Sequence, residues 1–127
     1  MIKAVLDSSA VLAYMQDEFG ASVVDEALGD VLISSVNLTE VLTKLVENGS
    51  TFASAVSSFA ALEIPVADFT RDLAEDAAEM SPQAEVYGLS LGDRACLALA
   101  RRERLPVMTT DRAWRSVDVG VEIQLIR

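Results

Sequence analysis

Short apolar segments alternate with helical patterns along this sequence of 127 residues. Five of the apolar segments have the length and composition of β-strands, namely Ile2–Leu6, Val31–Ile33, Ile64–Val66, Val107–Thr110 and Val121–Ile126. Strands that alternate with helices usually form a parallel sheet with helices on both faces. The pattern therefore predicts an α/β fold with a central, mainly parallel sheet, and it places any ligand crevice at the carboxyl ends of the strands.

The clearest helical pattern has apolar residues at positions i, i+3, i+4, i+7 and i+8, namely Leu38, Val41, Leu42, Leu45 and Val46. Ser34 and Ser35 precede this stripe as candidate N-caps, and Asn48-Gly49 closes it as helix ends commonly do. Other helices are predicted over Ser9–Met15, Phe19–Leu28, Thr51–Leu62, Thr70–Met80 and Gly92–Arg104. Leu105-Pro106 ends the last of them, because proline cannot continue a helix.

The sequence gives no sign of division into several domains. It contains no linker rich in Pro, Gly or Ser, no internal repeat and no low-complexity tract, so we expect a single domain over residues 1–127. Its uncharged stretches are too short or too mixed to span a bilayer, and it lacks the features of a signal peptide. We therefore expect a cytoplasmic protein that does not associate with membranes.

Two residue types that carry much enzyme chemistry are nearly missing. The chain has no histidine and one cysteine, Cys96. This composition excludes an internal disulfide, a typical zinc site and a histidine-based catalytic triad. Any catalysis must use carboxylates, hydroxyls, amines or a metal ion.

The net charge of −10 argues against binding of nucleic acid through the overall electrostatic field. Basic residues are nevertheless concentrated near the end of the chain, where seven arginines occur: Arg94, Arg101, Arg102, Arg104, Arg112, Arg115 and Arg127. Arginine binds phosphate well because its planar fork donates two hydrogen bonds at once. We take Arg94, Arg112 and Arg115 as candidates for contacts with the phosphate groups of a nucleic acid. Arg101, Arg102 and Arg104 fit equally well as residues that offset a helix dipole.

Three aspartates stand where a parallel sheet would place a ligand. Asp7 follows the first predicted strand, Asp111 follows the strand Val107–Thr110, and Asp93 begins a predicted helix after Gly92. Each aspartate on its own fits an N-cap, whose carboxylate accepts a backbone N–H. Their shared position at strand and helix ends favours a common site.

Glu40 is open to two interpretations. On a helical wheel the apolar stripe leaves Glu40 on the opposite side, four residues before Lys44, as in an exposed ion pair. A helix that lines a crevice can instead turn its polar side toward a site. The wheel alone does not decide between these positions.

Four segments in order resemble the motifs of PIN-domain proteins, in particular the VapC toxins: "VLDSSAVLAY", "SSVNLTEVL", "LSLGDRACLALA" and "VMTTDRAW". The most specific part is "SLGDRACLALARRERLPVMTTDRAW", which resembles the third and fourth motifs of that family. The resemblance covers nearly the whole chain and implies a PIN-like three-layer α/β/α sandwich. It also implies a catalytic, metal-binding set made of Asp7, Glu40, Asp93 and Asp111, with Ser8 and Thr110 as neighbouring hydroxyls that orient the site.

The resemblance implies a metal-dependent endoribonuclease that cleaves RNA and acts as the toxin of a type II toxin–antitoxin pair. Its expected partners are a cognate antitoxin and a second copy of the chain. The alternative is a non-catalytic PIN-like scaffold that binds partner proteins. Two other classes with this architecture lack their required residues: a receiver domain needs a lysine after the last core strand, and a haloacid-dehalogenase phosphatase needs an aspartate where Ser9 stands.

The chemistry of clustered carboxylates agrees with a metal site. Two unit charges about 4 Å apart repel by roughly 4 kcal/mol at an effective dielectric near 20, so a group of acids needs a cation. An oxygen-only site suits Mg²⁺ or Mn²⁺, which can activate water and stabilise a leaving oxygen. Of the remaining residues, Trp114 fits either base stacking or core packing, and Cys96 fits a buried, inert thiol.

Overall fold

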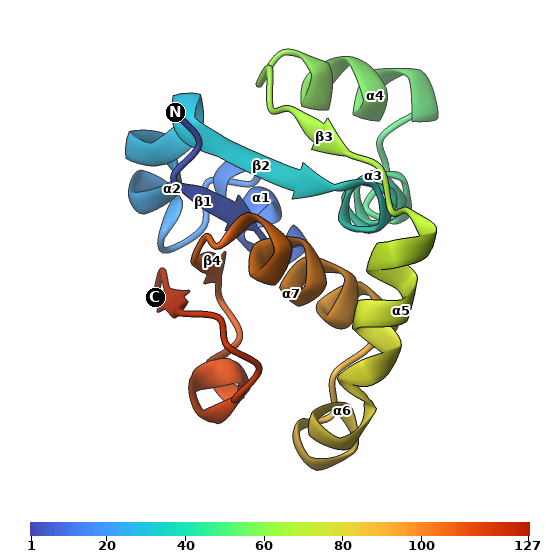
Figure 1. The fold of residues 1–127 in the computed structure, drawn as a ribbon. Helices are drawn as coiled ribbons and strands as arrows, with labels where there is room; N and C mark the ends of the chain where they lie inside the picture. The colour runs from blue at the N-terminus through green and yellow to red at the C-terminus, as the bar shows by residue number, and fades with distance from the viewer.

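The computed structural model describes residues 1–127 and has a five-stranded sheet at its centre (Figure 1). The strands are β1 (Ala4–Leu6), β2 (Val31–Ser34), β3 (Val66–Ala67), β4 (Val107–Thr109) and β5 (Ile123–Leu125). They lie in the order β3-β2-β1-β4-β5, and all neighbouring pairs are parallel. The prediction of a mainly parallel sheet is confirmed.

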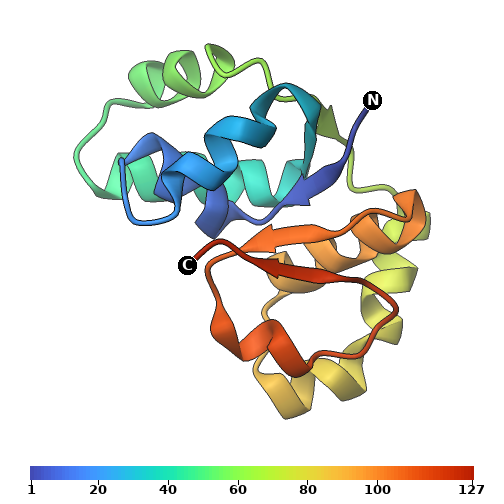
Figure 2. The ribbon, with the colours of Figure 1, turned by 90° about the vertical axis from the view of Figure 1, so that its left-hand side faces the viewer.

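Seven α-helices and two 3₁₀ helices connect the strands. They are α1 (Ser8–Met15), α2 (Ala21–Ala27), η1 (Leu28–Asp30), α3 (Ser35–Glu47), α4 (Phe52–Ala60), α5 (Arg71–Glu79), α6 (Ser81–Tyr87), α7 (Leu91–Glu103) and η2 (Arg112–Ser116). Figure 2 shows the helices from the first half of the chain on one side of the sheet and α5 to α7 on the other. The molecule is thus a three-layer α/β/α sandwich, as the sequence predicts.

The sheet separates two hydrophobic clusters. One cluster contains Leu6 and Ile33 from the strands together with residues of α1, α3 and α4. The other contains Val5 and Val107 together with residues of α5, α7 and η2. Leu6 and Val5 are adjacent in β1 and fully buried on opposite faces, because successive side chains of a strand alternate. A strand buried on both faces explains the continuous apolar run at the start of the sequence.

One predicted helix begins later than expected, and one observed helix was not predicted. The helix predicted over Phe19–Leu28 begins only at Ala21, because Gly20 has a left-handed φ of 100° and cannot belong to an α-helix. The helix α6 was not predicted at all. It follows α5 after Met80, has proline in its first turn and ends at Gly88 with a φ of 68°. Proline is acceptable there because first-turn N–H groups have no partner within the helix.

The other boundaries agree with the sequence to within one to three residues. Ser34 caps α3, since its hydroxyl accepts the Val36 N–H at 3.2 Å. The helix α7 ends at Arg104, which has a left-handed φ of 56° just before Leu105-Pro106. No helix in the structure has the length and apolar character needed to cross a membrane.

Candidate functional site

The strand order places the ends of β1 and β4 next to each other, and an aspartate follows each of them. The chain runs from β1 to β2 and β3 on one side of the sheet and returns to β4 on the other side of β1. In open α/β sheets, ligands bind at such a switch point, outside the carboxyl ends of the strands. Asp7 directly follows β1, and its backbone N–H donates to the carbonyl of Met108 in β4 at 3.0 Å. Asp111 lies two residues beyond the end of β4.

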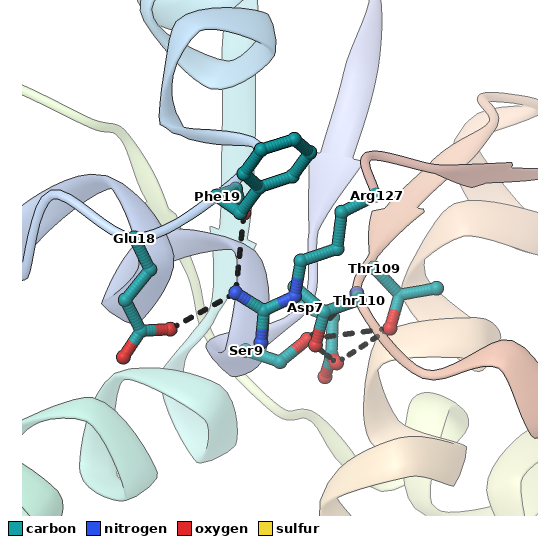
Figure 3. Close-up of polar contacts among 7 residues, drawn as sticks. All are labelled: Asp7, Ser9, Glu18, Phe19, Thr109, Thr110 and Arg127. Atoms are coloured by element: carbon teal, nitrogen blue, oxygen red, sulfur yellow. Dashed lines mark hydrogen bonds and ion pairs between the residues drawn. The ribbon is translucent and has the colours of Figure 1, made fainter.

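Asp7 is held by two hydroxyls (Figure 3). Ser9 Oγ donates to Asp7 Oδ2 at 2.7 Å, and Thr109 Oγ1 donates to the same oxygen at 2.9 Å. Each hydroxyl accepts a backbone N–H in turn, from Thr110 to Ser9 at 3.1 Å and from Asp111 to Thr109 at 3.1 Å. These N–H groups direct the hydroxyl hydrogens toward the carboxylate. The network thereby ties the end of β1 to the end of β4.

The network changes the roles expected for Ser8 and Thr110, the two hydroxyl residues that the sequence analysis names. Thr110 contributes its backbone N–H, whereas the neighbouring Thr109 supplies the hydroxyl that contacts Asp7. Ser8 contacts a different acid, because its Oγ donates to Glu40 Oε1 at 2.9 Å. Ser9 and Thr109 were missed in the sequence. The only sequence pattern that points to them is their spacing: Ser9 lies two residues after Asp7, and Thr109 lies two residues before Asp111.

The second oxygen of Asp7 is the most unusual feature of the site. Asp7 is only 4% exposed, and its buried Oδ1 has no hydrogen-bond partner. Burial raises the pKa of Asp7 from 3.8 to about 6; the bonds from Ser9 and Thr109 oppose this increase, and the charges of Asp93 and Glu40 add to it. A buried acceptor without a donor is costly unless a cation or water satisfies it.

Glu40 points into the same region from α3. It is half-buried, and Lys44 pairs with Glu47 at 3.5 Å rather than with Glu40, so the exposed Glu40–Lys44 pair is wrong. Glu40 Oε1 accepts two hydrogen bonds, one from Ser8 and one from Asn37 Nδ2 at 2.9 Å. Glu40 Oε2 accepts none and lies against Gly92 at the start of α7.

Asp93 is an N-terminal capping residue of α7. Its carboxylate accepts the Ser90 N–H at 2.8 Å and Ser90 Oγ accepts the Asp93 N–H, which together form a capping box. Partial burial raises the pKa of Asp93; the bonds from Ser90 oppose this, and the charges of Glu40 and Asp111 add to the increase. Asp93 is therefore a helix cap that also lies within electrostatic reach of the other acids.

Asp111 is the most exposed of the four acids. Its side chain accepts the Ala113 N–H at 2.9 Å and caps η2. Two exposed arginines, Arg112 and Arg115, follow it on this short helix. The ion pairs of the structure involve Arg71, Arg101, Arg102 and Arg127 but neither of these two. Arg112 and Arg115 thus form no ion pair within the protein.

Two other arginines from the end of the chain, and Trp114, make their contacts within the protein. Arg94 is half-buried and donates to the carbonyl of Ala77 in α5 at 3.5 Å. Arg127 donates to Glu18 Oε1 and to the Phe19 carbonyl, both at 3.1 Å (Figure 3). Trp114 is fully buried in the core, so base stacking by its indole is excluded in this structure.

The four acids form one electrostatic unit. Asp7 is coupled to Asp93 and Glu40, and Asp93 is coupled to Glu40 and Asp111. Burial also raises the pKa of the Cys96 thiol well above its ordinary value, and the charges of Asp7, Asp93 and Glu40 add to this effect. Cys96 is therefore protonated and inert, as expected from the sequence.

The donor set fits a hard divalent cation. Asp7 Oδ1 and Glu40 Oε2 accept no hydrogen bond, and both belong to carboxylates whose other oxygen is fixed. No three of the acids are drawn together as a complete ligand set, since Asp93 and Asp111 cap helices. Mg²⁺ does not require one, because it commonly binds one or two carboxylates and keeps several waters. The residues present therefore fit Mg²⁺ or Mn²⁺.

Gly92 is required by the position of Glu40. A Cβ atom at residue 92 would overlap the carboxylate of Glu40. We expect Gly92→Ala to lower the free energy of unfolding by about 1–3 kcal/mol, because either α7 or Glu40 must move. Urea unfolding monitored by circular dichroism measures this change. Gly29→Ala is the matched control, since nothing lies within 4 Å of a Cβ at that glycine; equal stability of the Gly92→Ala variant and wild type would contradict the close approach.

Comparison with known proteins adds to this geometry. The family model described as "PIN domain" matches residues 4–120. No curated protein matches the sequence. Solved structures do match: a toxin–antitoxin complex from Klebsiella pneumoniae has a TM-score of 0.75 and 19% identity, with 98% of each chain covered.

Two further structures have similar values. DNA-bound VapBC from Salmonella typhimurium has a TM-score of 0.72 and 18% identity over 100% of both chains. VapC20 from Mycobacterium tuberculosis, described as a toxin that cleaves the sarcin–ricin loop, has a TM-score of 0.72 and 19% identity over 94% of this chain and 99% of its own. At such identities the likeness establishes the fold. Together with the family match over residues 4–120, it shows that the chain belongs to the PIN-domain family.

Proposed function

We propose that this chain is a Mg²⁺- or Mn²⁺-dependent endoribonuclease and the toxin of a type II toxin–antitoxin pair. The observation that carries this proposal is the buried Asp7, whose Oδ1 has no partner at the switch point of the sheet and whose carboxylate lies within electrostatic reach of Glu40 and Asp93. Such an arrangement is unfavourable without a cation and favourable with one. Membership of the PIN family and the VapBC-like fold support the same assignment.

In this proposal the four acids act as two pairs. Asp7 and Glu40 would hold the cation, since each has a carboxylate oxygen that accepts no hydrogen bond, and Asp93 and Asp111 would add negative charge nearby. When bound, Mg²⁺ or Mn²⁺ activates water for attack on phosphorus and stabilises the leaving oxygen. Ser9 and Thr109 fix Asp7, and Ser8 fixes Glu40, so that the carboxylates need little reorganisation.

RNA binding is assigned to the surface beside Asp111. The exposed Arg112 and Arg115 on η2 can each pair with a backbone phosphate, which would offset the acidic balance of the chain locally. The remaining parts of the proposal follow from the family: an antitoxin protein that blocks the site, a homodimer of the toxin, and action in the cytoplasm.

An RNA cleavage assay tests this proposal. The purified chain, freed from any co-expressed partner, is incubated with total RNA with and without Mg²⁺ or Mn²⁺, and the new RNA ends are sequenced. Discrete cleavage that needs the metal is the expected result. The alternative of a non-catalytic scaffold draws on the use of Asp93 and Asp111 as helix caps, and it predicts no metal-dependent turnover.

We also expect Mg²⁺ or Mn²⁺ to raise the melting temperature in a concentration-dependent way. A ligand that binds only the folded state stabilises it by RT ln(1 + [L]/Kd), which is about 1 kcal/mol at a few times Kd. This corresponds to a rise of roughly 3–5 °C for a chain of this size. Differential scanning calorimetry measures it. A rise of the same size in an Asp7→Asn, Asp93→Asn double variant would place the metal elsewhere.

A further inference from the structure

Asn37 is a fully buried polar residue in the first turn of α3. Its Nδ2 donates to Glu40 Oε1 at 2.9 Å and to the carbonyl of Gly92 at 3.1 Å. Both neighbours are acceptors only, so the NH₂ group must face them. One amide group therefore links a site carboxylate on α3 to the first turn of α7, next to Asp93.

The other half of this amide lowers the stability of the fold. Asn37 Oδ1 is buried and has no hydrogen-bond partner. A buried carbonyl without a donor is destabilising, and an apolar residue in its place would avoid that cost. The side chain thus gives up stability at this position while it supplies two donors to the site.

We infer that Asn37 is a positioning residue: it holds Glu40 and the start of α7 at a fixed separation, so that Glu40 Oε2 stays turned toward the cation site. Three observations converge on this role. Asn37 and Ser8 both donate to Glu40 Oε1, which fixes the carboxylate from two elements. The carboxylate lies where a Cβ of residue 92 would be, so only glycine permits the approach. Asn37 also binds the Gly92 carbonyl itself.

This inference rests on the proposed function, since it assigns Asn37 to the same metal site. It goes further by naming a residue that touches neither substrate nor metal. Its effect is transmitted through Glu40. Removal of the amide should therefore weaken metal binding in the absence of any RNA, and not only the rate of cleavage.

The test measures Mn²⁺ binding to the metal-free chain by electron paramagnetic resonance of the free ion, together with RNA cleavage. Asn37→Ala is expected to lower Mn²⁺ affinity on the order of 10-fold and cleavage at subsaturating Mn²⁺ at least as much. Ser8→Ala, which removes one donor and keeps the link to α7, should have a smaller effect. Asn48→Ala is the matched control, because the other asparagine of the chain lies exposed at the opposite end of α3.

A second control separates positioning from loss of stability. Val41 is a fully buried residue of the same helix, and its apolar side chain donates no hydrogen bond to Glu40. Val41→Ala therefore creates a cavity without removing a donor to that carboxylate. This variant should melt at a lower temperature and bind Mn²⁺ as wild type does. Wild-type affinity in Asn37→Ala, or an equal loss in Val41→Ala, would overturn the positioning role alone. Absence of Mn²⁺ binding and cleavage in the wild type would overturn the proposed function, and the inference with it.

Discussion

We expect the Asp7→Asn variant to lose RNA cleavage by at least about 100-fold, while its metal-free form becomes more stable than wild type at neutral pH. The two effects have the same origin. In the proposed function the charge on Asp7 recruits the cation, and the same charge is buried with one oxygen unpaired. Asparagine keeps the shape and an acceptor for Ser9 and Thr109, but it carries no charge.

The gain in stability follows from the difference between the pKa of Asp7 in the folded state and its pKa in the unfolded chain. Burial raises the pKa of Asp7 from 3.8 to about 6, so the folded state holds the proton more tightly than the unfolded chain does. Well below pH 4 the group is protonated in both states and has no effect. Between about pH 4 and pH 6 the unfolded chain releases the proton while the folded state keeps it, so the contribution of Asp7 to stability falls as the pH rises. Above about pH 6 Asp7 is ionised in both states and the loss is complete, at up to about 3 kcal/mol. The gain from Asp7→Asn should therefore be full above about pH 7 and vanish near pH 4.

Urea unfolding of both proteins from pH 4 to pH 8, in a chelating buffer, measures this difference. Asp118→Asn is the matched control, because it makes the same chemical change at an exposed position away from the site. It should leave both cleavage and stability unchanged. Wild-type cleavage by Asp7→Asn at saturating Mg²⁺ would remove Asp7 from the catalytic site, and a stability difference that does not depend on pH would contradict the buried charge.

The fold could be predicted from the sequence because its strands are simple to identify. β1 is buried on both faces, so its apolar run is continuous, and the ends of β1 and β4 are marked by Asp7 and by Thr110-Asp111. The helix α6 could not be predicted in the same way. It is short, begins with Ser81-Pro82 directly after α5, and has no fully buried residue, so no apolar stripe announces it.

The site was predictable to a smaller extent. Strand ends gave three aspartates, but Glu40 came only from the family resemblance, since the helical wheel places it away from the core. The wheel fails because α3 packs its first turns against α7 as well as against the sheet, so a polar side of the helix is also covered. Asn37 illustrates the same limit. An asparagine beside an apolar stripe has the pattern of a surface residue, and only the contact with Gly92 explains its burial.

The second large effect concerns inhibition by the antitoxin, and it rests on the proposed function. We expect a segment of the antitoxin to place an arginine or lysine among Asp7, Glu40, Asp93 and Asp111. The positive side chain would relieve the repulsion between the carboxylates, which is the same repulsion that otherwise favours a metal ion. The Asp7→Asn, Asp93→Asn double variant should then bind the antitoxin at least about 30-fold more weakly, as expected when a buried charged group loses its partner.

Binding of the antitoxin to wild type and to the double variant is best measured by calorimetry over a salt series, with and without Mn²⁺. The variant should show a shallower salt dependence, because fewer charges are paired at the interface. Mn²⁺ should weaken binding to wild type and not to the variant, since cation and metal compete for one site. The Asp118→Asn protein controls for a general loss of negative charge. Equal affinity of the double variant and wild type at all salt concentrations would mean that the antitoxin inhibits by covering the RNA path beside Arg112 and Arg115, without occupying the carboxylates.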